Sequence, residues 1–122
     1  MSNLIWVAAG GAIGASLRYL SSITIKFIYP SFPFGTLFVN VLGSFIIGLL
    51  MNYLENRNVP ENFIRYFIII GLLGSYTTFS TFSFEVIDLV NNRKIFISLI
   101  YILLSVSSCL FFAFLGYNIN KI

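Results

Sequence analysis

Four long apolar stretches fill almost the whole chain, and they constrain its fold more than any other feature. They cover residues 3–27, 34–53, 62–90 and 95–117, and each is at least as long as the roughly 20 apolar residues that a helix needs to cross a bilayer. Of the 122 residues, 58% are hydrophobic and 9% are charged, and the mean hydropathy is +0.94. We therefore expect an all-α integral membrane protein, a single domain of four transmembrane helices over 1–122.

The third stretch contains the most unusual segment of the chain, Gly71–Glu85, which reads GLLGSYTTFSTFSFE. A continuous helix over 62–90 would be about 43 Å long, well beyond a hydrocarbon thickness of about 30 Å. The residues least favourable to a helix gather at 74–78. We predict that the third helix is broken there, as membrane helices tolerate where the backbone lines a cavity. The first functional hypothesis is an ion or solute site.

The first stretch combines small residues with one embedded charge. Gly10 and Gly14, and likewise Gly11 and Ala15, are four residues apart, a spacing that predicts close helix contact. Arg18 falls between the predicted midplane and the far interface, and it has two interpretations. Its side chain either snorkels to the headgroups or places a positive charge in a water-filled vestibule that attracts anions.

Polar positions recur at helical spacing in the second and fourth stretches. They are Thr36, Asn40 and Ser44 in the second, and Tyr101, Ser105 and Ser108 or Cys109 in the fourth. Asn40 is either a contact between helices or a ligand group, and its position favours neither. Serines in membrane helices often bond back to the preceding turn. Because polar stripes avoid lipid, those of the second, third and fourth helices should converge.

The sequence offers no catalytic constellation, so we predict that the protein is not an enzyme. It has no histidine, and its single cysteine, Cys109, allows neither a zinc site nor an intrachain disulfide. Glu55 and Glu61 belong to a predicted loop, and Glu85 and Asp88 come near the end of the third helix. Since the lysines also lie at helix ends, no nucleophile has a basic partner.

The groups expected inside the membrane are neutral donors and aromatic rings. They are Thr36, Asn40, Phe79, Ser80, Thr81, Phe82, Tyr101 and Ser105. A cation-coupled exporter would need an embedded carboxylate, whereas hydroxyl and amide donors and the positive edges of phenyl rings suit a small anion. Phe79 and Phe82 share a helix face, although such a pair is also common in core packing. The composition of this set favours anion passage.

The basic residues near helix ends are balanced between the two sides of the membrane. Four spans place Arg57, Arg65 and Lys121 on one side and Lys26, Arg93 and Lys94 on the other. The positive-inside rule therefore gives no preferred orientation. We predict dual topology, with chains inserted both ways and paired as an antiparallel homodimer, which supplies the inverted symmetry that other transporters obtain by internal duplication.

Three segments resemble the Fluc/CrcB family of fluoride channels. They are GGAIGASLRY over 10–19, PFGTLFVNVLGSF over 33–45 and GLLGSYTTFSTFSFE over 71–85, and the resemblance covers nearly the whole chain. It implies a dual-topology homodimer in the cell (inner or plasma) membrane. Two antiparallel pores would let fluoride leave the cytoplasm passively.

The resemblance also implies roles for individual residues. Asn40, Phe79 and Phe82 would line the ion path, with Ser80 and Thr81 beside them, and Thr36, Tyr101 and Ser105 would form a polar track. A structural sodium ion would be held on the dimer axis by the backbone carbonyls of Gly74 and Thr77. Carbonyl oxygens of an unwound helix are suitable hard donors for such a cation.

Two alternatives to the channel come from other functional classes. A small dual-topology multidrug exporter has the same size and number of spans, but it needs an acidic residue deep in the first helix, where this chain has Arg18. A membrane scaffold subunit without transport activity would explain the packing glycines. It would leave the three polar stripes without a purpose.

Overall fold

The computed structural model describes residues 2–57 and 62–121, and the regular structure in these ranges is helical. Residues 58–61, including the predicted loop residue Glu61, lie outside them. The elements are α1 (Ser2–Ile28), α2 (Phe34–Glu55), the π-helix η1 (Phe63–Leu73), α3 (Gly74–Tyr76), α4 (Phe79–Asn91), α5 (Ile95–Asn118) and the 3-10 helix η2 (Ile119–Lys121).

Within the described ranges, four helical segments are long and apolar enough to cross a membrane. They are Ser2–Ile28, Phe34–Glu55, Phe63–Asn91 and Ile95–Lys121. Their bounds agree closely with the four predicted helices, which confirms the all-α membrane fold. The third span combines η1, α3 and α4.

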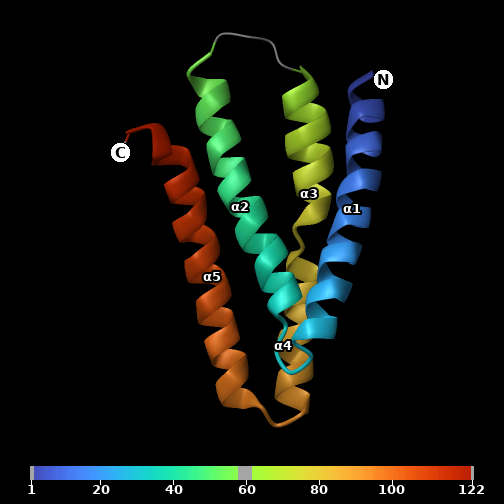
Figure 1. The fold of residues 1–122 in the computed structure, drawn as a ribbon, viewed down its shortest axis with the longest axis vertical. Helices are drawn as coiled ribbons and strands as arrows, with labels where there is room; N and C mark the ends of the chain where they lie inside the picture. The colour runs from blue at the N-terminus through green and yellow to red at the C-terminus, as the bar shows by residue number, and fades with distance from the viewer. Residues whose placement is uncertain (1, 58–61, 122) are drawn as a thin grey trace.

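The third span crosses from one side of the molecule to the other. Figure 1 shows α1 and α5 at opposite edges, both termini at one end, and the turns from α1 to α2 and from α4 to α5 at the other end. The first part of the third span, η1 and α3, packs against α1, whereas α4 packs against α5. Helix α2 packs mainly on α5. The two halves of the third span therefore have different neighbours.

Glycines let the backbones of α1 and η1 approach closely. A Cβ atom on Gly10 would lie 2.1 Å from the carbonyl oxygen of Phe67, and one on Gly14 would lie 2.1 Å from that of Leu72. Both glycines are buried. The predicted close contact of the first helix is confirmed, and its partner is the first half of the third span.

The backbone of the third span leaves helical geometry at two residues. Thr77 (φ −84°, ψ 155°) and Thr78 (φ −152°, ψ 118°) are extended, while Gly74–Tyr76 are helical. The Thr78 hydroxyl accepts a hydrogen bond from the amide of Thr81 at 3.1 Å and so caps α4. Figure 1 shows this non-helical stretch between α3 and α4. Helical geometry thus stops and restarts within the span, where Thr78 serves as the N-cap.

Candidate functional site

The extended segment is held by a side chain from α2. Asn40 accepts a hydrogen bond from the Thr78 amide at 2.8 Å and donates one to the Thr78 carbonyl at 3.0 Å. One amide group thereby satisfies both backbone polar groups of a residue that stands outside a helix. Such groups are costly to leave unpaired in a membrane. Of the two interpretations of Asn40, this contact between helices is the one that the structure contains.

The backbone carbonyls of Gly74 and Ser75, which precede Thr78, differ in their hydrogen-bond partners. In a continuous helix the Thr78 amide would bond to the carbonyl of Gly74, but here it donates to Asn40. The Ser75 carbonyl accepts a hydrogen bond from Arg18 Nε at 3.0 Å. A cation at this place is favourable because the carbonyls at a helix C-terminus carry partial negative charge. Arg18 is thus bound to the third span.

A first cavity of about 440 Å³ opens beside the extended segment. The predicted site residues that line it are Asn40, Gly74, Thr77, Phe79, Phe82 and Ser105. The ring centroids of Phe79 and Phe82 are 5.3 Å apart, but the two rings differ in burial, since Phe79 is 75% exposed and Phe82 only 7%. One ring is therefore packed in the core while the other is open to the surroundings of the chain.

Two other predicted site residues surround the cap of α4. The Thr78 hydroxyl lies 3.2 Å from the hydroxyl of Ser80 and donates to that of Thr81 at 3.2 Å. Ser80 is exposed and Thr81 half-buried. These hydroxyls gather at the first turn of α4, next to the first cavity.

Glu85, which we predicted only to lie near the end of the third helix, is half-buried and forms the centre of a polar cluster. Its carboxylate accepts hydrogen bonds from the Thr36 hydroxyl and, at 3.0 Å, from that of Tyr101. Tyr101 is fully buried. The polar stripes of the second, third and fourth spans therefore meet, as predicted, but they meet around a carboxylate. Its spacing three residues after Phe82 was the signal, because it places both side chains on one helix face.

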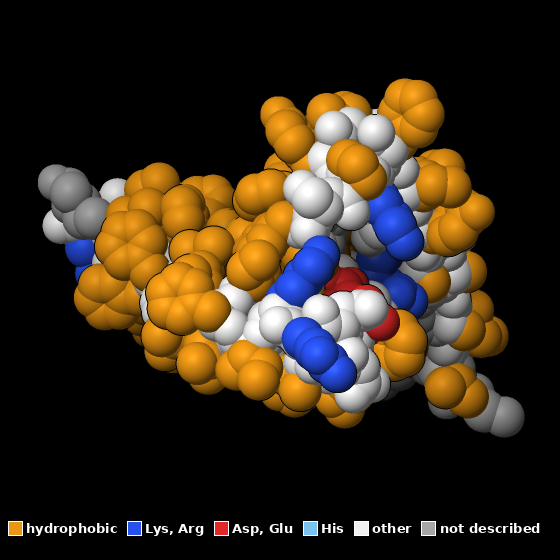
Figure 2. Space-filling view, turned by 90° about the horizontal axis from the view of Figure 1, so that it is seen from below, with side chains coloured by type: hydrophobic (Ala, Val, Ile, Leu, Met, Phe, Trp, Pro, Cys, Tyr) orange, Lys and Arg blue, Asp and Glu red, His pale blue; other side chains and the backbone are white. Residues whose placement is uncertain are grey.

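A second cavity lies on the other side of the cluster, at the lower end of the molecule. This second cavity, of about 280 Å³, is lined by Thr36 and Glu85 together with Lys26, Asp88 and Lys94. Tyr101 stands between the two cavities, since its ring centroid is 5.1 Å from that of Phe82 while its hydroxyl bonds to Glu85. Figure 2 shows acidic side chains surrounded by Lys and Arg side chains at this end.

One hydroxyl in the site has no hydrogen-bond partner in the described part of the chain. Ser105 Oγ is buried and lines the first cavity. Three other serines in the spans, Ser16, Ser83 and Ser107, donate to a carbonyl of the preceding turn. Ser105 has no such bond.

Fold and site together define a small multi-pass membrane protein in which a cluster of polar side chains lies between two cavities. Residues 5–117 match the family described as CrcB-like protein, Camphor Resistance (CrcB). The chain belongs to this family.

Similar proteins bear the name fluoride-specific ion channel FluC. The chain is 51% identical over 118 residues to the one from Shewanella denitrificans, covering 95% of this chain and 94% of the relative. It is 47% identical over 122 residues to one from Campylobacter jejuni, covering 99% of each. It is 40% identical over 122 residues to one from Flavobacterium psychrophilum, covering 99% of this chain and 98% of the relative. These names describe a channel and not an enzyme.

Proposed function

We propose that the chain forms a fluoride-selective channel of the cell membrane, through which fluoride leaves the cytoplasm passively. The observation that carries this function is the polar cluster of Thr36, Glu85 and Tyr101, which lies between two cavities. The name of the relatives supplies the ion. Because neutral hydrogen fluoride crosses membranes and ionises inside, a cell in acid surroundings accumulates fluoride. A passive path driven by the membrane potential lowers that concentration.

The chemistry of the first cavity suits a small anion. An anion that enters a membrane loses water, and it needs donors in exchange. Ser105 offers an unpartnered hydroxyl, and Ser80 and Thr81 offer further hydroxyls near the cap of α4. The edges of the Phe79 and Phe82 rings carry partial positive charge.

The open side of the first cavity supports a second copy of the chain. Phe79 is largely exposed there, and a Cβ on Gly74 would meet only the Ile69 carbonyl oxygen, at 3.6 Å. Polar backbone facing lipid is unfavourable, so this face needs a protein partner. The balanced basic residues fit a partner inserted the opposite way. We assign an antiparallel homodimer, with the interruption of the third span at its interface and two pores.

A structural sodium ion fits the carbonyls at the interruption. The Gly74 carbonyl loses its helical partner to Asn40, and the extended Thr77 departs from the geometry in which its carbonyl would continue the helix. Hard oxygen donors of this kind suit a cation. Replacing sodium by N-methyl-D-glucamine should lower the melting temperature of the purified dimer. An unchanged melting temperature would contradict the assignment.

Fluoride efflux from liposomes tests the function. Purified protein is reconstituted with fluoride inside, and release is followed with a fluoride electrode beside a parallel chloride experiment. We expect rapid fluoride release while chloride is retained. A proton-coupled exporter would instead respond to a pH gradient, and a scaffold subunit would release neither ion. No release from folded protein would contradict the homodimeric channel.

A further inference from the structure

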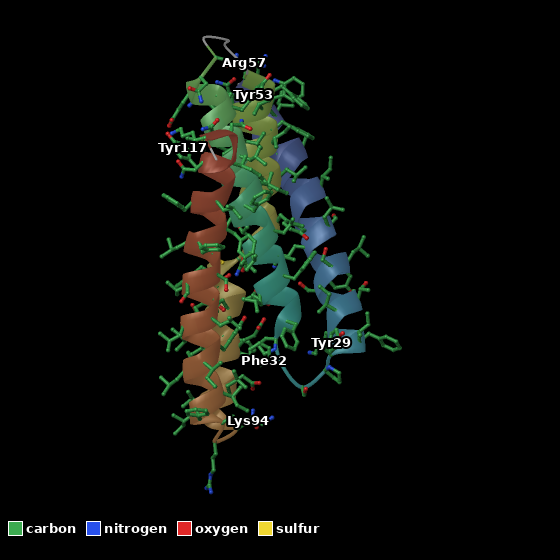
Figure 3. All side chains as sticks on the ribbon, turned by 60° about the vertical axis from the view of Figure 1, so that its left-hand side comes forward. Tyr29, Phe32, Tyr53, Arg57, Lys94 and Tyr117 are labelled. Atoms are coloured by element: carbon green, nitrogen blue, oxygen red, sulfur yellow. The ribbon has the colours of Figure 1, made fainter. Side chains whose placement is uncertain are left out.

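The turn between α1 and α2 places an aromatic ring, that of Phe32, in the wall of the second cavity. Phe32 is half-buried and packs against the core formed by Phe82, Leu89 and Tyr101. In Figure 3 it lies inside the lower end of the bundle, whereas Tyr29 of the same turn lies at the periphery. Phe32 therefore points toward the site although it belongs to no helix.

The backbone of the turn holds this ring in place. The amide of Phe34 donates to the carbonyl of Phe32 at 2.8 Å, and Pro33 between them has φ −77° and ψ 56°. This geometry is an inverse γ-turn. Proline restricts φ to the value that the turn needs, so the position of the Phe32 ring is built into the sequence.

Phe32 continues a series of aromatic rings. Ring centroids are 5.3 Å apart between Phe79 and Phe82, 5.1 Å between Phe82 and Tyr101, and 5.3 Å between Tyr101 and Phe32. The last pair is edge-to-face, with an angle of 77° between the rings. The series begins at the extended segment of the third span and reaches the second cavity at Phe32, whose ring also contacts that of Phe34 at a centroid distance of 4.5 Å.

The ring of Phe32 also forms part of the wall of the second cavity. Thr36 and Glu85 line the same cavity, together with Lys26 and Lys94. The ring thus lies beside the place where the lysines, which attract anions, give way to the polar cluster around Glu85.

We propose that Phe32 is a pore-lining residue at the end of the ion path that opens into the second cavity. Its ring presents an aromatic surface where the ion loses water, and its edge-to-face contact keeps Tyr101 on Glu85. This inference rests on the proposed channel function. It assigns to the turn a role in permeation besides the connection of two helices.

The test compares Phe32→Ile, which keeps apolar volume, with Phe32→Tyr, which keeps the ring. Tyr29→Ile is the matched control, because Tyr29 belongs to the same turn but is exposed and lines an apolar groove that does not include the polar cluster. We expect Phe32→Ile to lower fluoride efflux about tenfold, an effect of the size that an aromatic contact gives. Phe32→Tyr and Tyr29→Ile should keep the wild-type rate within about twofold.

Rates are normalised to dimer recovered by gel filtration, and the melting temperature is measured for each variant. A merely structural role would lower the melting temperature and the folded fraction, and it would leave the normalised rate unchanged. That result would overturn the proposal, as would full efflux by folded Phe32→Ile. Absence of efflux from the wild type would instead remove the channel function itself, and the inference with it.

Cysteine labelling keeps the proposal testable if Phe32→Ile does not fold. Phe32→Cys is made in a Cys109→Ala chain, whose own efflux rate is the reference, and treated with a bulky methanethiosulfonate reagent. Labelling of Phe32→Cys should block fluoride efflux, whereas labelling of the exposed Tyr29→Cys should not. Labelled Phe32→Cys that conducts like its unlabelled form would overturn the proposal.

Discussion

The two halves of the third span, although adjacent in sequence, pack against their neighbours in different ways. Its first half, η1 and α3, lies against α1 through glycine contacts in which backbone meets backbone. Its second half, α4, presents Phe82 and Glu85 to side chains of α2 and α5. The first half anchors the span and the second forms the site. Their separation at Thr77 and Thr78 lets each half take its own neighbours.

The largest loss of stability is expected where α1 and the first half of the third span are in backbone contact. Gly14→Val would place a Cβ 2.1 Å from the Leu72 carbonyl oxygen and 3.0 Å from its Cα, and backbone atoms cannot rotate away. We expect destabilisation above about 4 kcal/mol, and therefore loss of folded protein. Gel filtration and thermal unfolding in detergent measure it. The exposed Ala9→Val on the same helix is the control, and a well-folded Gly14→Val would break the comparison.

Asn40→Ala tests the joint between the halves. The substitution leaves the amide and carbonyl of Thr78 without their partner. Unpaired buried groups cost about 1–3 kcal/mol each. An increase of about 3 kcal/mol in the barrier to fluoride passage corresponds to about a hundredfold fall in efflux. Asn118→Ala removes an amide that bonds only to its own helix, at Phe114, and should conduct normally. Equal rates for the two variants would contradict the role of Asn40.

Glu85→Gln sharpens the account of the second half. The amide keeps the shape of the side chain but offers one acceptor atom in place of two, so the hydroxyl of Thr36 or of Tyr101 loses its bond. Hydrogen bonds to charged groups contribute about 1.5–3 kcal/mol, so efflux should fall about tenfold or more. Asp88→Asn, at the mouth of the same cavity, should have a smaller effect. A larger fall in efflux for Asp88→Asn than for Glu85→Gln would show that the second cavity, and not the polar cluster around Glu85, limits flux.

The smallest effect separates two neighbouring serines of α5. Ser105→Ala removes a hydroxyl without a partner in the described residues, so the melting temperature should not fall. If the hydroxyl serves the ion, efflux should fall about threefold, the equivalent of a weak hydrogen bond. Ser107→Ala removes a hydroxyl that bonds back to its own helix and should change neither quantity. A lower melting temperature for Ser105→Ala alone would assign that hydroxyl to packing.

Hydrophobic length and small-residue spacing were sufficient to predict the fold. The four spans and the contact of Gly10 and Gly14 depend on patterns local to each helix, which the sequence displays directly. The π-helix η1 over Phe63–Leu73 was not predicted. Its winding depends on hydrogen bonds five residues apart, for which no residue type in that run is diagnostic.

The site was predicted in part, for a related reason. Polar stripes indicated Thr36, Asn40, Tyr101 and Ser105, since polar groups in a membrane avoid lipid. The sequence placed Glu85 only near a helix end. Its hydrogen bonds come from donors on two other spans, and such contacts are not visible in the pattern of one helix. The bond from Arg18 to the Ser75 carbonyl likewise joins residues distant in sequence. Contacts between spans require the packing of the helices, which periodicity alone does not give.

Electrical recording tests the central claim of a passive fluoride path most directly. The purified protein is inserted in a planar bilayer with fluoride on one side and chloride on the other, at equal pH and then with a pH gradient. We predict a current carried from the fluoride side, with a reversal potential that shows strong preference for fluoride over chloride and does not shift with the pH gradient. A reversal potential that follows chloride or protons, or the absence of current from folded protein, would contradict the account.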